Sequence, residues 1–288
     1  VVHLRLHFQL LLAPVFLWAW LVATHDRPAA GSERLTGAVV LAFLCLHVFL
    51  YGGATAFNSA YDRDTGPIGG LQHPPPVVRA LLPFSVAVKL AGLVLAAYVG
   101  PQFLAIAIVL VLLSVAYSRS WPRLKGRPLG SLLTVGAGQG ALVYAAGWAA
   151  VRGDVRSLLE PTGLLGALAA TAFIVGLYPL TQLFQVDEDR ARGDRTVAVA
   201  WGAATCFTVS LVAQAVGGLA MLAVLARLFG PGDALVVGAG LLAQFGFTAW
   251  WATRFEPAGV LANFHRVMRM NAAGATGLGL YLLVRGLS

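Results

Sequence analysis

The sequence has little charge and few cysteines, and it lacks the alternation of polar and apolar residues that marks β-strands. Of its 288 residues, 11% are charged and 58% are hydrophobic, whereas about 25% of a soluble domain is charged. This composition excludes an ordinary soluble domain, and the missing alternation excludes an outer-membrane barrel. Cys45 and Cys206 both lie inside apolar runs. We therefore expect two small core residues, not a disulfide or a metal-binding pair.

Long apolar runs are what the sequence has in abundance. A helix crosses the hydrocarbon core with about 20 apolar residues, and such runs recur along the whole chain. We predict an all-α, polytopic membrane bundle of about nine transmembrane helices, built from two related halves and forming a single domain over residues 1–288. The predicted helices cover residues 6–24, 35–57, 77–99, 101–118, 129–150, 162–186, 197–228, 233–253 and 267–286.

The basic residues predict the orientation of these helices. Nine crossings place the N-terminus and every second loop on one face. That face holds 13 of the 20 Lys and Arg residues, the other face holds 6, including Arg27 and Arg34, and Lys89 lies within a predicted helix. The positive-inside rule then makes the first face cytoplasmic. Because the basic residues are scattered over loops between spans, we do not expect nucleic-acid binding. The expected location is the cell membrane.

Two polar segments repeat one pattern at an offset of 127 residues. Both fit Y-x5-F-[NQ]-x3-D-R-x2-G, which indicates two related halves with the same polar device at the end of a long helix. The first segment contributes Tyr51, Phe57, Asn58, Asp62, Arg63 and Gly66, and the second contributes Tyr178, Phe184, Gln185, Asp189, Arg190 and Gly193.

The repeated residues have the chemistry of a metal and diphosphate site. In each segment the amide and the carboxylate are four residues apart, so on a helix they share one face. Their oxygens suit Mg2+, which binds through one or two carboxylates together with substrate phosphates. Asp187 is expected to face away from Gln185. The predicted metal ligands are Asn58, Asp62, Asp64, Glu188 and Asp189, and the predicted cationic helpers are Arg63, Arg190, Arg123 and Lys125.

At these residues the chain resembles the UbiA superfamily of intramembrane prenyltransferases. The family motifs N-x3-D-x3-D and D-x3-D-x3-G-x2-T correspond here to Asn58-x3-Asp62-x3-Gly66 and Gln185-x3-Asp189-x3-Gly193-x2-Thr196. A third family signature appears as Tyr117, Ser118, Arg123, Leu124, Lys125 and Gly130. The chain departs from the family at Gly66 and Gln185, where one carboxylate of each motif is missing.

The resemblance implies a Mg2+-dependent prenyltransferase. A prenyl diphosphate would ionise at the polar helix ends, and a lipophilic acceptor would capture the allylic cation among membrane lipids. Asp62, Asp189, Arg63 and Lys125 are the expected catalytic residues. The expected substrate-binding residues are Asn58, Arg123, Tyr117, Arg190, Tyr51, Tyr178 and Gln185. Two alternatives stay open: a terpene cyclase that needs no acceptor, and a non-catalytic lipid-binding protein of the same fold.

Overall fold

The computed structural model describes residues 1–26 and 37–288. Within these residues it has nine helical segments that are long and apolar enough to cross a membrane, which confirms the predicted all-helical bundle. No strand occurs in the described part of the chain. The segments are Val2–Asp26, Gly37–Asp62, Leu81–Val99, Pro101–Ser118, Pro128–Arg152, Pro161–Gln182, Val197–Phe229, Pro231–Thr253 and Val260–Leu287.

Three of the nine spans consist of two labelled helices, and one short helix lies outside the spans. The divided spans contain α1 (Leu6–Gln9) and α2 (Ala13–Asp26), α3 (Gly37–Leu44) and α4 (Tyr51–Asp62), and α7 (Pro128–Val135) and α8 (Leu142–Arg152). The others are α5 (Leu81–Val99), α6 (Pro101–Ser118), α9 (Pro161–Gln182), α11 (Val197–Phe229), α12 (Pro231–Thr253) and α13 (Val260–Leu287), with the short α10 at Val186–Ala191.

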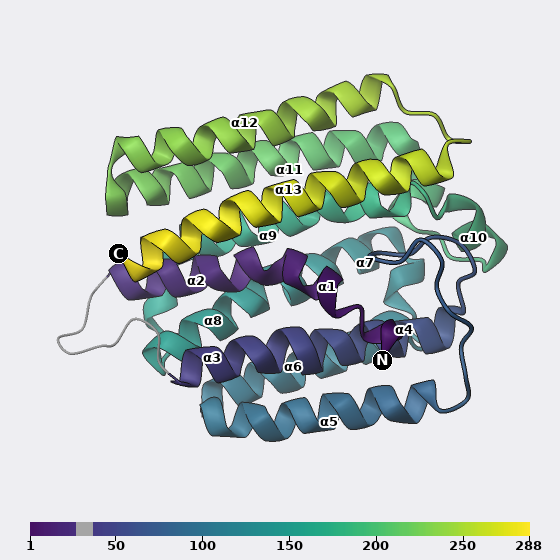
Figure 1. Cartoon of the computed structure of the whole chain (residues 1–288), viewed down its shortest axis with the longest axis horizontal. Helices are drawn as coiled ribbons and strands as arrows, with labels where there is room; N and C mark the ends of the chain where they lie inside the picture. The colour runs from purple at the N-terminus through teal and green to yellow at the C-terminus, as the bar shows by residue number, and fades with distance from the viewer. Residues whose placement is uncertain (27–36) are drawn as a thin grey trace.

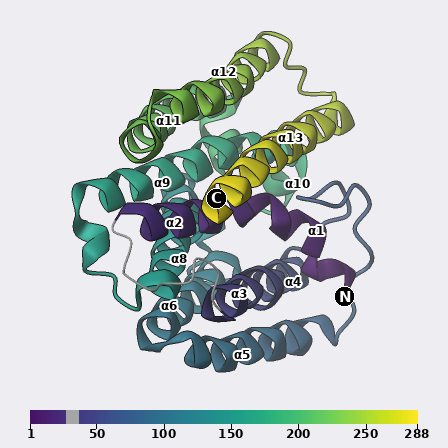
Figure 2. The same cartoon turned by 60° about the vertical axis from the view of Figure 1, so that its left-hand side comes forward.

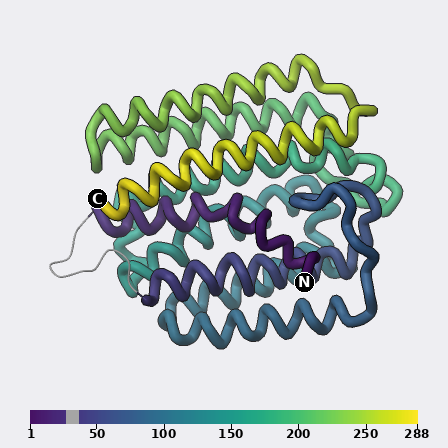
Figure 3. The backbone as a smooth tube through the Cα atoms, in the orientation of Figure 1, coloured from purple at the N-terminus to yellow at the C-terminus, as the bar shows by residue number. Residues whose placement is uncertain are grey.

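The helix axes run roughly along one direction, with α11 and α12 on one side of the bundle and α5 and α6 on the other (Figure 1). Between them lie α9, which packs along α11, and α2, which contacts both α8 and α13. The two chain termini lie toward opposite ends of the bundle (Figure 3). One end carries α10, the last turn of α4 and the loop 63–80 (Figures 1 and 2). We call it the polar end.

Several helix boundaries differ from the sequence prediction; the third helix, for example, begins at Leu81 and not at residue 77. The second span continues beyond residue 57 to Asp62, so that the first polar segment remains helical. The sixth ends at Gln182, and Val186 begins a separate short helix. The ninth begins at Val260, seven residues before the predicted start. Arg27, Arg34 and the first two residues of the second predicted helix lie outside the described residues.

Two spans change from α-helix to π-helix at mid-length, over Cys45–Leu50 and Gly136–Ala141. Short π-helical segments are rare and occur often at functional sites. In the second segment Gly140 lies against α9, where an added Cβ would be 2.6 Å from the Cα of Thr171. Only glycine permits this approach. Cys45 and Cys206 are free and buried, as the sequence predicts.

Candidate active site

A cavity of about 1070 Å3 extends into the bundle from its polar end. Most of its wall is apolar and comes from α2, α6, α9, α12 and α13. Its polar lining includes the carboxylates and amides of both repeated segments: Asn58, Asp62, Asp64, Gln185 and Asp189. The structure therefore brings the two segments, 127 residues apart in the chain, to one site.

Asp62 is the last residue of α4, and its carboxylate is buried between two cations. One oxygen accepts a hydrogen bond from Nζ of Lys125 at 2.5 Å, and the other accepts one from Nη2 of Arg123 at 3.1 Å. One turn earlier on α4, the amide oxygen of Asn58 accepts a hydrogen bond from the Ser118 hydroxyl at 3.0 Å. The loop after α6 thus supplies the two cations that pair with Asp62.

Arg123 connects this loop to the second motif. Its Nε and Nη2 donate to the two carboxylate oxygens of Asp194 at 2.6 and 2.7 Å, and its Nη1 donates to the carbonyl oxygen of Ser118. The hydrogen bond to Asp194 raises the pKa of Arg123 most strongly, and the charges of Asp62 and Asp194 raise it further against the effect of burial. Burial alone would raise the pKa of Asp194, but the hydrogen bond from Arg123 and the neighbouring cations lower it. Both groups are therefore charged at neutral pH.

The second motif is built on a broken helix. After α9 ends at Gln182, Gln185 forms the N-cap of α10, which places Asp189 in the middle of that short helix. Asp189 is buried and lines the cavity. Asp187, two residues earlier, has a side chain that is 89% exposed and pairs only with Arg190. The predicted orientation of Asp187, away from the site, agrees with this exposure.

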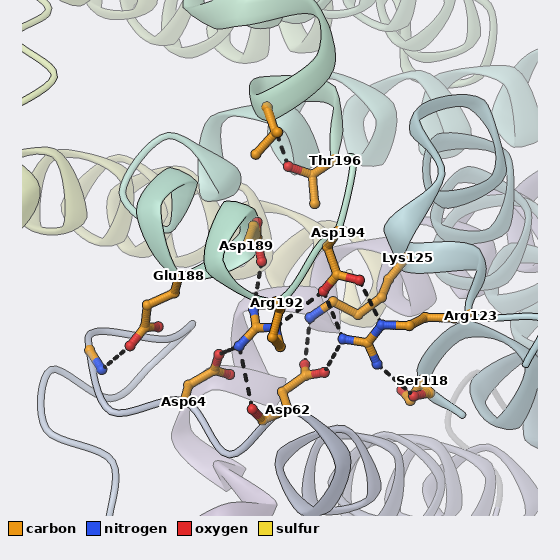
Figure 4. Close-up of polar contacts among 12 residues, drawn as sticks. Asp62, Asp64, Ser118, Arg123, Lys125, Glu188, Asp189, Arg192, Asp194 and Thr196 are labelled. Atoms are coloured by element: carbon orange, nitrogen blue, oxygen red, sulfur yellow. Dashed lines mark hydrogen bonds and ion pairs between the residues drawn. The ribbon is translucent and has the colours of Figure 1, made fainter. Parts of the chain in front are cut away.

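Arg192 lies at the centre of the polar network (Figure 4). Its guanidinium donates to Asp64 of the first segment, to Asp189 at 2.6 Å and to Asp194 at 3.1 Å. Burial raises the pKa of both Asp64 and Asp189, while Lys125 and Arg192 oppose that rise. For Arg192, the surrounding carboxylates outweigh burial and raise its pKa. Arg192 is thus a permanent cation shared by both motifs.

Equivalent residues of the repeat have matching environments. Phe57 and Phe184 are each 4% exposed, and each packs in the core immediately before the amide of its motif. The pairs Tyr51 and Tyr178, Asn58 and Gln185, and Asp62 and Asp189 all line the cavity, whereas Arg63 and Arg190 are both exposed. The two segments therefore agree in side-chain placement, although the first lies on one helix up to Asp62 and the second is divided between α9 and α10.

Four predicted site residues do not line the cavity, and one of them is Arg123, whose guanidinium is bound to Asp62 and Asp194. Arg63 caps α4 in the left-handed conformation and is exposed, and Arg190 is exposed with Asp187 as its partner. Glu188 accepts hydrogen bonds from the backbone of Thr65 and Gly66, so it fastens the second motif to the loop after the first. Glu188 does not line the cavity, and its role as a metal ligand stays a prediction.

Three other residues belong to the site and do not appear among the sequence candidates. Arg192 and Asp194 complete the network described above. Arg5 lines the cavity, is 6% exposed, and donates to the Ser59 hydroxyl at 2.7 Å. The spacing of Arg192 is a usable signal, since three residues along a helix return it to the face of Asp189.

The tyrosines of the predicted site face the same cavity. The hydroxyls of Tyr117 and Tyr178 lie 2.9 Å apart and form a hydrogen bond between α6 and α9. Tyr51 lines the cavity from α4 and is buried. Such rings present a negative π face that attracts a cation. The cavity is thus lined by groups able to stabilise positive charge next to its ionised end.

The side-chain oxygens at the site can be compared with the ligands that Mg2+ prefers. Asp64 and Asp189 each give one carboxylate oxygen to Arg192, and for the other oxygen we find no hydrogen bond within residues 1–26 and 37–288. Together with Asp62 and Asn58, these are the hard ligands Mg2+ prefers. In the described residues, however, no three acidic, His or Cys side chains are grouped as a metal site by themselves. The ligand types fit, and a diphosphate would have to complete the set.

The two positions that lack a carboxylate, Gln185 and Gly66, have different surroundings, so substitution by aspartate should have different effects at each. Gln185 lines the cavity and caps α10, where aspartate is also a favoured N-cap. Gln185→Asp should therefore fold and lower the Mg2+ concentration needed for half-maximal diphosphate binding, because it adds a charged ligand. Gly66→Asp should fail to do so, since its Cβ would lie 3.1 Å from Oε1 of Glu188. Isothermal titration with and without Mg2+ measures both; an unchanged requirement in Gln185→Asp removes Gln185 from the metal environment.

The fold and site define a class: a multi-pass helical membrane protein with a buried ionised cluster at the mouth of an apolar cavity. The chain belongs to the UbiA prenyltransferase family, whose model matches residues 11–272. The comparison with curated proteins found no match.

Solved structures share this fold at low sequence identity. A UbiA homologue from Aeropyrum pernix K1 in its apo form is 19% identical, with a TM-score of 0.69 over 96% of this chain and 97% of that one. A homologue from Archaeoglobus fulgidus bound to GPP and Mg2+ is 18% identical, with a TM-score of 0.62 over 94% and 99%. Digeranylgeranylglyceryl phosphate synthase is 14% identical, with a TM-score of 0.62 over 100% and 99%.

Proposed function

We propose that this protein transfers a prenyl group from a prenyl diphosphate to an aromatic or other lipophilic acceptor inside the membrane, with Mg2+ as cofactor. One observation carries the proposal: a single cavity joins the acids of both repeated motifs, and Lys125 of the third, to a long apolar interior. The polar end suits a diphosphate, and the apolar wall suits an isoprenoid chain. Relatives of the same fold have been solved with GPP or DMAPP and Mg2+.

In this mechanism the protein residues act on the leaving group and on the cation. Mg2+, held by Asp62, Asp64, Asp189 and Asn58, would neutralise diphosphate charge when bound. Lys125, at the cavity wall, stabilises the negative charge that develops on the bridging oxygen as the carbon–oxygen bond breaks. The bonding electrons leave with the diphosphate, the acceptor forms the new bond to the allylic carbon, and the acceptor loses a proton.

The apolar wall protects the allylic cation until it is captured. Water would hydrolyse such a cation, so the reaction requires a cavity from which water is excluded. Tyr51, Tyr117 and Tyr178 present aromatic rings to this space and stabilise positive charge there. We propose that the polar end faces the cytoplasm, as the distribution of basic residues predicts, and that residues 1–288 act as one domain.

A direct assay tests the proposal. Purified protein in lipid is incubated with a panel of prenyl diphosphates, with Mg2+ or EDTA, and with or without lipophilic acceptors. Released diphosphate is measured, and products are identified by mass spectrometry. Mg2+-dependent release that requires an acceptor supports transfer. Release without an acceptor, with a cyclic product, would indicate a cyclase instead, and no release with any substrate would contradict an enzymatic role.

The cavity also predicts a position at which a larger side chain would limit the length of the prenyl chain that fits. Gly138 is buried in the cavity wall, and an added Cβ would meet only Leu113 and Leu110, at 3.9 and 4.0 Å. Gly138→Leu should therefore fill part of the apolar space and shift the preferred substrate to a shorter chain. Gly246→Leu is the control, since Gly246 on α12 is exposed with no atom near its added Cβ. Competition between prenyl diphosphates of different length measures the shift, and equal preference in both variants would contradict it.

A further inference from the structure

The sequence places one carboxylate fewer in each acidic motif than the family pattern has, yet the structure holds the two motifs firmly together. Three side chains make contacts between them, Glu188, Arg123 and Arg192, and Arg192 joins two of the acids that line the cavity, Asp64 and Asp189. The guanidinium of Arg192 donates hydrogen bonds to Asp64, in the loop after α4, and to Asp189, in α10. Its Nη1 also lies 3.4 Å from the carbonyl oxygen of Asp62. Arg123 also bridges the two segments, from Asp62 to Asp194, but among the described residues only Arg192 bonds both Asp64 and Asp189.

Arg192 lies behind the acids as seen from the cavity. Asp64 and Asp189 line the cavity wall, whereas Arg192 does not. Each of these carboxylates uses one oxygen for Arg192. A planar guanidinium can hold two carboxylates in a defined relative orientation, which a lysine cannot do. The second carboxylate oxygen of Asp64 and that of Asp189, which do not bond Arg192, are thereby held in a fixed relative position.

Charge supports this arrangement. The connected network contains four carboxylates, Asp62, Asp64, Asp189 and Asp194, and three cations, Arg123, Lys125 and Arg192. With all groups ionised it carries one net negative charge before any ligand binds. Without Arg192 that surplus would be two charges, and the buried Asp64 and Asp189 would repel one another across the site. Asp64 has no other cation within ion-pair distance among the described residues.

We infer that Arg192 is the positioning residue that makes one divalent-cation site out of the two incomplete motifs. Resting on the proposed function, the inference assigns Asp64 and Asp189 as ligands and Arg192 as the group that orients both. Partners that orient metal-ligating carboxylates from behind typically contribute 10–100-fold to metal affinity. The side chain of Arg192 acts without touching the substrate.

The test is Mn2+ binding to the purified full chain in lipid, followed by electron paramagnetic resonance of the free ion. Arg192→Gln should weaken Mn2+ binding by about 10–100-fold, and Arg192→Lys should lie between that variant and the wild type because it cannot bond both acids. Arg190→Gln is the matched control: it removes an arginine two residues away whose side chain is 64% exposed and pairs only with Asp187. Thermal unfolding is recorded for each variant.

A double-mutant cycle separates orientation from general destabilisation. If Arg192 acts through Asp64, then Asp64→Asn should weaken Mn2+ binding strongly in the wild type and much less in Arg192→Gln. Unchanged or tighter Mn2+ binding in a folded Arg192→Gln or Arg192→Lys variant would overturn the inference, the tighter result because Arg192 would then compete with the metal. Should Arg192→Gln not fold, Arg192→Lys decides.

The outcomes also separate this inference from the proposed function. Prenyl transfer by the wild type, with equal Mn2+ affinity in Arg192→Gln, overturns only the role of Arg192. Weakened Mn2+ binding in Arg192→Gln, with a wild type that turns over no prenyl diphosphate, overturns only the proposed function. A wild type that binds no Mn2+ overturns the inference and the metal requirement together.

Discussion

Asp62→Ala and Asp189→Ala are each expected to lower turnover by at least about a hundredfold, the cost typical of removing one preorganised electrostatic group from an active site. Asp62 holds Lys125 and Arg123 at the cavity mouth, and Asp189 is one of the two acids bonded by Arg192. Asp187→Ala, in contrast, should stay near the wild-type rate because its side chain points into solvent. Initial rates of diphosphate release measure all three.

The thermal stability of each variant is the control, because a loss of activity could also come from unfolding. Breaking a buried ion pair by removing one partner commonly costs about 3–5 kcal/mol, so Asp62→Ala also carries a risk of unfolding. Asp62→Asn keeps the shape of the side chain and removes its charge, and it is compared with Asp62→Ala by thermal unfolding. Equal activity losses at Asp187 and Asp189 would contradict the placement of α10 described here.

Lys125→Met is expected to weaken diphosphate binding by about 10–100-fold, corresponding to 1.4–2.7 kcal/mol. Nζ of Lys125 is a compact cation in the cavity wall, where low polarity strengthens its attraction for a phosphate. Methionine retains most of the apolar stem, so packing changes little. Direct binding of a prenyl diphosphate, measured by isothermal titration in Mg2+, gives the affinity.

Arg127→Met provides the matched control for Lys125. Arg127 lies in the same loop two residues further on, but it is exposed and does not line the cavity. If both residues serve only to orient the chain in the membrane, the two variants will bind diphosphate equally well. That result, in correctly inserted protein, would remove Lys125 from the proposed mechanism.

Much of the fold could be predicted from the sequence because lipid imposes a simple rule. A backbone in hydrocarbon must satisfy its hydrogen bonds internally, so each long apolar run becomes a helix. Composition and run length alone therefore predicted nine spans, which the described residues contain. Helix ends were less predictable. The ninth span starts earlier than predicted, and Arg266 and Arg269, which lie within it, line the cavity.

The repeat predicted the main candidate residues of the site for a similar reason. Residues four apart share a helix face, so Asn58 with Asp62 and Gln185 with Asp189 had to point in similar directions. Tertiary structure then brought the two faces to one cavity, together with Lys125 from the loop after α6. Which of these residues bind metal and substrate stays a prediction.

The cations show what the sequence by itself could not determine. Arg63 and Arg190 stand next to the acids in the chain but lie outside the cavity, because Arg63 ends α4 in a left-handed turn and Arg190 is one residue past the buried face of α10. Asp194 joins the network through the turn at Gly193, where φ is +80°. The sequence determined the helices and the acidic motifs through local periodicity. Only the tertiary structure decided which charges pair, since pairing depends on how separate turns and loops meet in space.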